Sequence, residues 1–277
     1  MNEEELLIEK AVSLYETIRK ISEKKLDDIY NNTTEKVHVF GFGSSSFSVL
    51  TSQHRKVNFV KGNTNIESFL KILFKLELEK GDLYNFIDLG CGDGECLGAT
   101  LLFNSLSSPL EKCKFSNLIG VDLQKQQLES AHMFLNELND SLKTENPDLV
   151  LPEISVKHSD FLEINWNELL SVASRSVLYM CATCFTDGLI LSIMKSIFPM
   201  LLNGSIIICL DKDLNEYYHN PQLEEFPDIT TTRQNANTHP VEILNGEYEY
   251  QLQLVFFQTC RTSWGQGIAY VYRKESR

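Results

Sequence analysis

The chain has 277 residues, of which 43% are hydrophobic and 23% charged, a composition that excludes collagen-like, low-complexity and largely disordered proteins. With 25 Lys and Arg against 38 Asp and Glu, its formal net charge is −13, which disfavours direct binding to nucleic acid or to an anionic membrane. No apolar run reaches the ~18 residues of a membrane-spanning helix, and the acidic start lacks the basic segment of a signal peptide. We therefore expect an intracellular protein, cytoplasmic or nuclear, with no membrane partner.

Seven cysteines are scattered along the chain, and we expect reduced thiols, several of them buried. Cys181 and Cys184 have C-x-x-C spacing before a predicted helix, whose N-terminus could lower the pKa of a thiol. A redox site or half of a zinc site is therefore an alternative. A structural zinc ion needs four ligands, however, and the sequence has no second C-x-x-C or C-x-x-H pair, so we expect no metal.

The first 30 residues carry apolar side chains at intervals of three to four, which predicts one or two amphipathic helices. A polar segment at residues 31–34 interrupts this pattern. We expect irregular structure or a short hairpin from residue 37 to residue 48. We interpret residues 1–58 as an N-terminal helical extension and residues 59–277 as the main domain.

From residue 62 onward helices and strands alternate. Strands are predicted at 84–89, 117–122, 154–158, 177–180 and 206–210, and helices at 65–73, from about 95, 125–139 and 189–202. The last part is rich in β-formers at 248–259 and 267–272, with no helix between them. This order predicts an α/β fold, a doubly wound, seven-stranded, Rossmann-like sheet whose last strand is antiparallel.

The most informative motif is Asp-Leu-Gly-Cys-Gly-Asp-Gly at residues 88–94, between an apolar strand and a helix. Glycines there allow a tight turn and the close approach of a ligand, and the helix N-terminus adds unpaired N–H groups. Glu95 stands where the dinucleotide fingerprint has its last glycine, and its charge would repel a pyrophosphate. A ligand with an ammonium and a sulfonium group suits this loop better, which predicts S-adenosyl-L-methionine as cofactor.

Two further acids follow the next predicted strands. Asp122 can accept hydrogen bonds from both hydroxyls of a ribose, and Asp160 can accept one from an adenine amino group. Phe161 can pack against the adenine ring. A single acid at a strand end is most simply a helix cap or turn former, but acids at three successive strand ends favour a nucleotide-type site.

This ordered set resembles the class I S-adenosylmethionine-dependent methyltransferases over about residues 60–277. A closer resemblance, to the disruptor-of-telomeric-silencing family of non-SET protein-lysine methyltransferases, is carried by Lys61-Gly62-Asn63-Thr64, the loop at 88–94, Cys181-Ala182-Thr183-Cys184-Phe185 and Ser263-Trp264-Gly265. The resemblance implies methyl transfer to a protein lysine, such as that of a histone. Three positions depart from it: Lys61 replaces a Tyr, Asn63 a Glu and Cys181 an Asn.

The resemblance also implies roles for individual residues. The implied cofactor-binding residues are Thr64, Asp88, Gly90, Gly92, Glu95, Asp122, Asp160 and Phe161. The implied walls of the acceptor channel are Cys181, Thr183, Phe185 and Trp264. The departures leave two alternatives open, a methyltransferase-fold binding subunit without activity and a small-molecule methyltransferase.

Acidic side chains are frequent where the mouth of such a site is expected. Asp93, Glu95, Asp187, Asp211 and Asp213 all follow predicted strands or begin helices. A negative field there would attract a basic protein or peptide, bound without direct contact to nucleic acid. Solvated loop acids that serve solubility are the alternative. The oligomeric state is not predicted.

Overall fold

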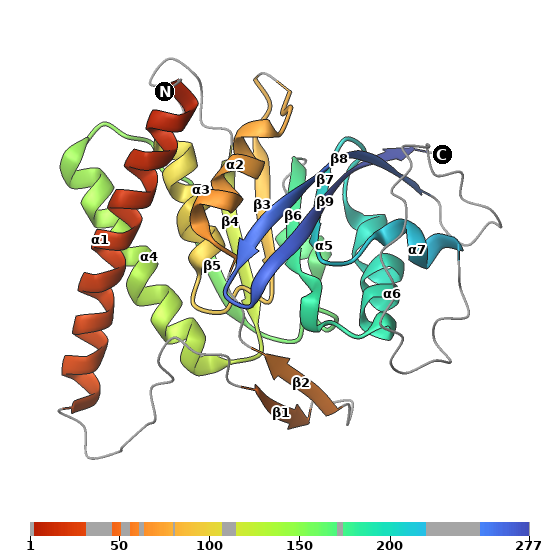
Figure 1. Ribbon diagram of the computed structural model, residues 1–277, viewed down its shortest axis with the longest axis horizontal. Helices are drawn as coiled ribbons and strands as arrows, with labels where there is room; N and C mark the ends of the chain where they lie inside the picture. The colour runs from red at the N-terminus through yellow and green to blue at the C-terminus, as the bar shows by residue number, and fades with distance from the viewer. Residues whose placement is uncertain are drawn as a thin grey trace.

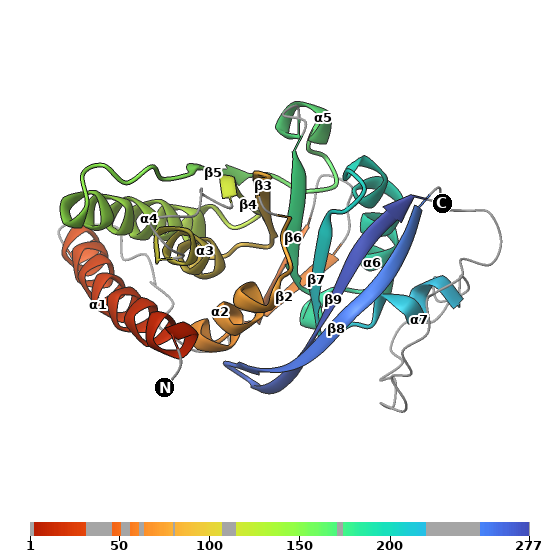
Figure 2. The same cartoon turned by 90° about the horizontal axis from the view of Figure 1, so that it is seen from above.

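The computed structural model describes residues 3–31, 46–50, 56–60, 64–79, 81–106, 115–170, 174–219 and 250–276. Its centre is a seven-stranded sheet with helices on both faces (Figures 1 and 2). The strands are β3 (Tyr84–Leu89), β4 (Phe115–Asp122), β5 (Glu153–His158), β6 (Arg175–Cys181), β7 (Ile206–Leu210), β8 (Tyr250–Thr262) and β9 (Gly265–Ser276).

The strand order in this sheet is β5-β4-β3-β6-β7-β9-β8. Neighbouring strands from β5 to β7 pair in parallel, whereas β9 is antiparallel to both β7 and β8. The order reverses next to β3, so β3 and its neighbours meet at the switch point where ligands bind in open α/β sheets. The predicted fold is confirmed: this is the Rossmann-like methyltransferase topology, with the last strand running against the rest.

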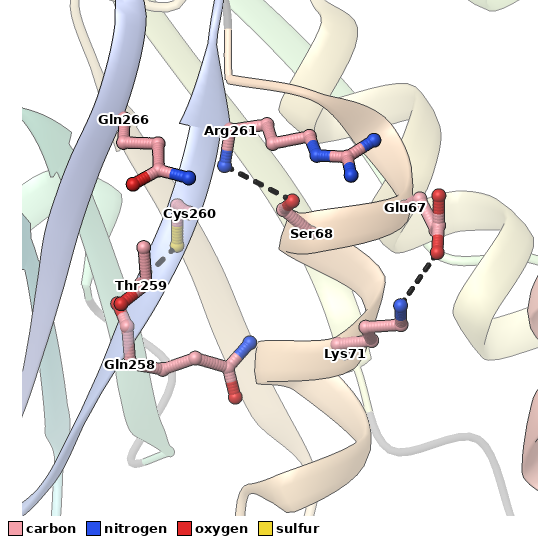
Figure 3. A pocket seen from close by; sticks show the side chains of 8 residues that line it. All are labelled: Glu67, Ser68, Lys71, Gln258, Thr259, Cys260, Arg261 and Gln266. Atoms are coloured by element: carbon pink, nitrogen blue, oxygen red, sulfur yellow. Dashed lines mark hydrogen bonds and ion pairs between the residues drawn. The ribbon is translucent and has the colours of Figure 1, made fainter.

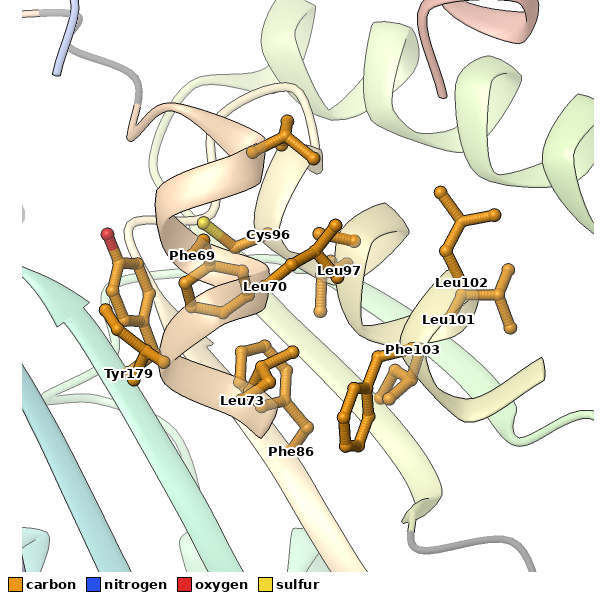
Figure 4. Close-up of a cluster of buried hydrophobic side chains, with 14 of the residues drawn as sticks. Phe69, Leu70, Leu73, Phe86, Cys96, Leu97, Leu101, Leu102, Phe103 and Tyr179 are labelled. Atoms are coloured by element: carbon orange, nitrogen blue, oxygen red, sulfur yellow. The ribbon is translucent and has the colours of Figure 1, made fainter. Parts of the chain in front are cut away.

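Two helical layers cover the sheet. One layer contains α1 (Glu3–Asn31), α2 (Ile66–Lys75), α3 (Glu95–Leu106) and α4 (Lys125–Glu145), and the other contains α5 (Trp166–Leu169), η1 (Ala182–Cys184), α6 (Asp187–Ser196), η2 (Phe198–Met200) and α7 (Leu214–His219). Each layer encloses its own cluster of buried apolar side chains. Figure 4 shows part of the first cluster, where the Phe69 ring meets the rings of Tyr179 at 5.0 Å and Phe86 at 6.0 Å.

The N-terminal helix α1 contributes to the hydrophobic core on one face of the sheet. Its buried side chains Ile8, Ala11, Tyr15 and Ile18 are part of the cluster that also contains Phe86. The helix contacts α2, α3 and α4, as Figure 2 shows. A single helix therefore forms where one or two were expected, and its apolar stripe explains why it docks. A domain boundary at residues 58/59 stays a prediction.

The structure also differs from the sequence-based expectation in places. The helix expected at 189–202 is α6 followed by the short η2, because Pro199 has no N–H with which to continue an α-helix. An antiparallel hairpin is formed by β1 (Ser46–Leu50) and β2 (Lys56–Val60), while residues 37–45 of the expected one lie outside the described residues. No helix in the described ranges is long and apolar enough to cross a membrane.

Candidate functional site

The loop between β3 and α3 turns at the carboxyl end of the central strand. The amides of Gly90 and Cys91 donate to the carbonyl oxygen of Val121 at 2.8 and 3.1 Å, which fastens the loop to the end of β4. Gly90 has φ 81°, a left-handed conformation that favours glycine. A Cβ at this position would lie 3.7 Å from the Phe185 ring, so the aromatic side chain packs over the loop.

Asp122, at the end of β4, holds this loop from the side. Its Oδ2 accepts a hydrogen bond from the Gly92 amide at 2.9 Å, and its Oδ1 accepts one from the Gln124 amide at 2.8 Å. Burial raises the pKa of Asp122, and these backbone donors act in the opposite direction. Each carboxylate oxygen has a lone pair for a second donor, as the predicted ribose contact requires.

Asp88 is the most deeply buried acid of the site, with 2% of its surface exposed. Burial raises the pKa of this carboxyl well above its ordinary range, and the charges of Asp122 and Asp93 raise it further. Glu95, at the start of α3, is also buried. Acidic side chains are therefore concentrated at the point where the loop meets the sheet.

Arg19 of α1 reaches this loop, and sequence reasoning missed it. The buried guanidinium forms an ion pair with the Asp93 carboxylate. The residue follows Tyr15 by four positions and so extends the apolar stripe of the helix. A charged residue on such a stripe must be paired if it is buried, and this was the signal available in the sequence.

Thr64 lies under the same end of the sheet, between α2 and the β8–β9 hairpin. Its Oγ1 is 2.5 Å from Tyr179 Oη, and it forms an isolated antiparallel bridge with Thr262. The adjacent amide of Asn65 donates to the Arg261 carbonyl at 2.8 Å. Residues 61–63, which carry two of the departures from the family pattern, lie outside the described residues.

Asp160 and Phe161 follow β5. The Oδ1 of Asp160 accepts a hydrogen bond from the Leu162 amide at 2.9 Å, so this acid forms a turn, the simpler of the two roles considered for it. Phe161 is buried, and its ring centroid lies 5.8 Å from that of Phe185 at an interplanar angle of 32°. Loops after β3, β5 and β6 are thus brought together by Gly90 and these two rings.

The loop after β6 is held by an acid from the end of β7. Thr183 Oγ1 donates to Asp211 Oδ2 at 2.7 Å, and Asp211 Oδ1 accepts from the Ile268 amide at 2.9 Å. Cys181 Sγ lies 3.9 Å from Thr183 Oγ1. Burial raises the pKa of the Cys181 thiol to about 12, which is opposite to the lowering considered for a redox cysteine. The thiol is therefore protonated at neutral pH and a poor nucleophile.

Trp264 stands in the turn between β8 and β9, as expected for the Ser-Trp turn, with 39% of its surface exposed. The bridge between Thr64 and Thr262 brings the tip of this hairpin beside α2. Its role as a wall of an acceptor channel stays a prediction.

The other acids expected at the mouth have internal partners. Asp187 Oδ1 accepts from Tyr217 Oη at 2.7 Å and pairs with Lys212 Nζ at 3.0 Å. Asp213 Oδ1 accepts from Tyr272 Oη at 2.6 Å and from the Asn215 amide at 3.0 Å. These acids therefore link α6, α7 and β9 near the end of β7 and are more than solvated loop residues. In the part of the chain that the structure describes, no group of three or more His, Cys, Asp or Glu is placed to hold a metal ion.

A groove of about 220 Å³ lies between α2 and β8 (Figure 3). Its walls are polar: Glu67 and Lys71 form an ion pair on the helix side, and the Arg261 amide donates to Ser68 Oγ at 3.1 Å across it. None of the predicted site residues lines it. This groove lies between α2 and the β8–β9 hairpin, and it is separate from the glycine loop.

No protein-family model and no curated protein matches the sequence. Among solved structures, a class I S-adenosylmethionine-dependent methyltransferase of Listeria monocytogenes has 10% identity and a TM-score of 0.48, covering 95% of this chain and 69% of that one. TrmK of M. capricolum, in complex with S-adenosyl-homocysteine, has 10% identity and a TM-score of 0.42 over 71% and 65% of the two chains. An rRNA methylase of Streptococcus thermophilus has 11% identity and a TM-score of 0.40 over 72% and 91%. At these identities and TM-scores we infer nothing about the substrate from the likeness.

Proposed function

We propose that the chain is an S-adenosyl-L-methionine-dependent methyltransferase that methylates a protein lysine. The observation that carries the cofactor assignment is the set of buried carboxylates at the glycine loop. The charge of Asp93 raises the pKa of both Asp88 and Asp122, so these acids lie close together, and the loop holds more acidic side chains than the Arg19 guanidinium can balance. Such a site favours a ligand that brings positive charge and disfavours a pyrophosphate.

The residues present fit this cofactor. The loop at Gly90 offers a backbone surface without a side chain, and the end of β4 offers Asp122 to a ribose. Phe185 offers aromatic surface, with the buried Phe161 ring packed against it, and Glu95 begins a helix of 12 residues at the loop. When bound, S-adenosylmethionine supplies an electrophilic methyl group on a sulfonium.

In this proposal the chain contributes mainly position and exclusion of water. Asp88 and Glu95 would face the cationic part of the cofactor, whose positive charge favours their ionised forms, while Thr64 orders the neighbouring strand ends through Tyr179. Cys181, Thr183, Phe185 and Trp264 would surround the acceptor nitrogen. Methyl transfer requires an aligned, unprotonated amine ~3 Å from the methyl group, and alignment supplies most of the acceleration. None of these residues needs to act as a strong base.

The lysine acceptor rests on the resemblance to the non-SET family and on the charge of the chain. Asp211 and Asp213 accept hydrogen bonds from neutral donors, so their charge is not cancelled by those contacts. The pKa of nearby Glu216 is raised, first by burial and then by Asp213, which is consistent with negative potential in this region. A lysine in a basic protein segment suits that potential.

Calorimetry with S-adenosylmethionine, S-adenosylhomocysteine and NAD⁺ tests the cofactor assignment. We expect the first two to bind and NAD⁺ not to bind. Asp122→Ala should weaken binding by about 1.5–3 kcal/mol, because a buried charged acceptor is lost. Asp140→Ala, which removes an exposed acid on α4, should leave the affinity unchanged.

Three results would contradict the proposal. Tighter binding of NAD⁺ than of S-adenosylmethionine would indicate a dinucleotide site. No binding of any of the three would favour the binding subunit without activity. Unchanged affinity in Asp122→Ala would place the cofactor elsewhere.

A further inference from the structure

The buried pair between Arg19 and Asp93 connects the N-terminal helix to the glycine loop, across 74 positions of sequence. Arg19 Nη2 pairs with the Asp93 carboxylate, and Nη1 donates to the Asp93 carbonyl oxygen at 3.4 Å. Nε pairs with Glu23 Oε1 at 3.1 Å, one turn along the same helix. Both partners of the pair are buried, Arg19 with 7% and Asp93 with 3% of its surface exposed.

The Arg19 guanidinium also packs against a side chain of α4. Its Cζ lies 5.2 Å from the centroid of the Phe134 ring, a cation–π distance. The Tyr15 ring meets Phe134 edge-on at 5.2 Å. Phe134 in turn fits against α3 because residue 98 is glycine, where a Cβ would lie 2.4 Å from the ring. Arg19 is therefore fixed by the packing of three helices.

Asp93 needs such an anchor because it lies between two glycines. Gly92 and Gly94 both have positive φ, and glycine on each side gives the backbone more conformations to lose than any other residue would. The Gly92 amide is fixed by Asp122 and the Gly94 amide by the Cys91 carbonyl at 2.9 Å. Arg19 fixes Asp93, which lies between these two glycines, because it contacts both the carboxylate and the carbonyl oxygen of Asp93.

We infer that Arg19 is a positioning residue for the cofactor loop, acting through Asp93, so that α1 is a working part of the cofactor site. This inference rests on the proposed function. If the role of Arg19 were purely electrostatic, its removal would change cofactor binding in the opposite direction from the loss that positioning predicts. Arg19 adds positive charge beside a site for a cationic ligand, and its removal by that effect alone would strengthen binding. If positioning dominates, removal weakens binding.

The test compares Arg19→Met, Asp93→Asn, the double variant and Arg19→Lys. We expect Arg19→Met to weaken the binding of S-adenosylmethionine at least tenfold by calorimetry, and Arg19→Lys to recover part of that loss. The double variant should bind no more weakly than the weaker single variant, because both changes remove the same interaction. In the protein without ligand, hydrogen exchange at residues 92–95 should accelerate in Arg19→Met.

Ile8→Ala is the matched control, since it opens a cavity under α1 three turns away from Arg19. It should lower the melting temperature and leave both the affinity and the exchange at residues 92–95 unchanged. Unchanged or tighter binding in Arg19→Met would overturn the inference, as would losses that multiply in the double variant. If the unaltered protein itself binds no S-adenosylmethionine, the proposed function fails, and this inference falls with it.

Discussion

Thr183 and Asp211 join the ends of β6 and β7 through a hydrogen bond of 2.7 Å, in which the threonine hydroxyl donates to the carboxylate. The other carboxylate oxygen accepts from the Ile268 amide of β9. Asp211 has φ 67°, and the carboxylate fits beside Gly267, where a Cβ would lie 2.5 Å from Oδ1. A non-glycine residue held in the left-handed region near a candidate site is a reason to expect function there.

Asp211→Asn should reverse the direction of the hydrogen bond between Thr183 and residue 211. The amide oxygen can keep the bond from Ile268, so the NH₂ group faces Thr183 and the hydroxyl must accept instead of donate. We expect about a tenfold lower rate of methyl transfer to a basic protein such as core histones, with unchanged affinity for the cofactor. Asp211→Ala, which loses both bonds, should in addition lower the free energy of unfolding by about 1–3 kcal/mol. An unaltered transfer rate in Asp211→Asn would show that the orientation of this hydroxyl is irrelevant.

Asp88 should make the protein without ligand less stable as the pH rises. Its folded pKa is well above the ordinary value of 3.8, chiefly because of burial and then because of Asp122 and Asp93. The contribution of the Asp88 side chain to the free energy of unfolding is therefore fully present below its ordinary pKa of 3.8 and is lost as the pH rises through its folded pKa. Asp88→Asn should be more stable than the unaltered protein at neutral pH, with a difference that disappears below pH ~4.

The same substitution should weaken cofactor binding at neutral pH at least tenfold, or ~1.4 kcal/mol, because the positive charge of a bound cofactor favours the ionised form of Asp88 and Asn cannot ionise. Urea denaturation across pH and calorimetry at neutral pH measure the two effects. Asp148→Asn, at an exposed position outside the site, is the control and should change neither. Lower stability in Asp88→Asn at neutral pH would mean that the carboxylate is a net stabilising group.

Gly98 and Gly188 are both helical glycines, and we expect opposite effects when each becomes alanine. In Gly98→Ala the new methyl would meet Phe134 at 2.4 Å, and overpacking should lower the free energy of unfolding by about 1–3 kcal/mol. In Gly188→Ala nothing lies within 4 Å, so the smaller entropy of the unfolded chain should stabilise the protein by about 0.5 kcal/mol. Thermal denaturation measures both. Equal effects of the two substitutions would contradict the tight fit of Phe134 against α3.

Salt should slow transfer to a basic protein if acids near the site attract the substrate. Between ~0.05 and ~0.3 M salt the screening length falls below ~10 Å, and the encounter rate should fall steeply. Initial rates on core histones, with the cofactor at saturation, measure this. A rate indifferent to salt would remove steering as an explanation. Stimulation by added duplex DNA or RNA would indicate a nucleic-acid-bound substrate.

Much of the fold could be predicted from local patterns. The strand Ile206–Leu210 was predicted at its observed bounds, because five apolar residues follow an Asn-Gly turn. Asp88 and Asp122 were expected at strand ends, and the structure joins the two strands through the loop that Asp122 holds at Gly92. Parallel strands place their carboxyl ends together, so spacing alone predicts that meeting.

The contacts between distant segments were beyond local reasoning. The place of Arg19 on the apolar stripe of α1 can be recognised in the sequence, but its partner Asp93, 74 positions away, cannot. Asp211 was expected as a loop acid, and the partners that hold it, Thr183 and Ile268, come from two other elements. Asp160 accepts the turn-forming hydrogen bond from the Leu162 amide, which is the simpler of its two predicted roles.

The docking of α1 on α4 has a consequence for biosynthesis. The stripe of Ile8, Ala11, Tyr15 and Ile18 leaves the ribosome before α4, the helix that packs on it, which ends at Glu145. At ~5–20 residues per second, the stripe stays exposed for on the order of ten seconds. During that time it can meet chaperones or neighbouring nascent chains. A nascent chain stalled before residue 125 should leave α1 open to protease, whereas the completed chain should protect it.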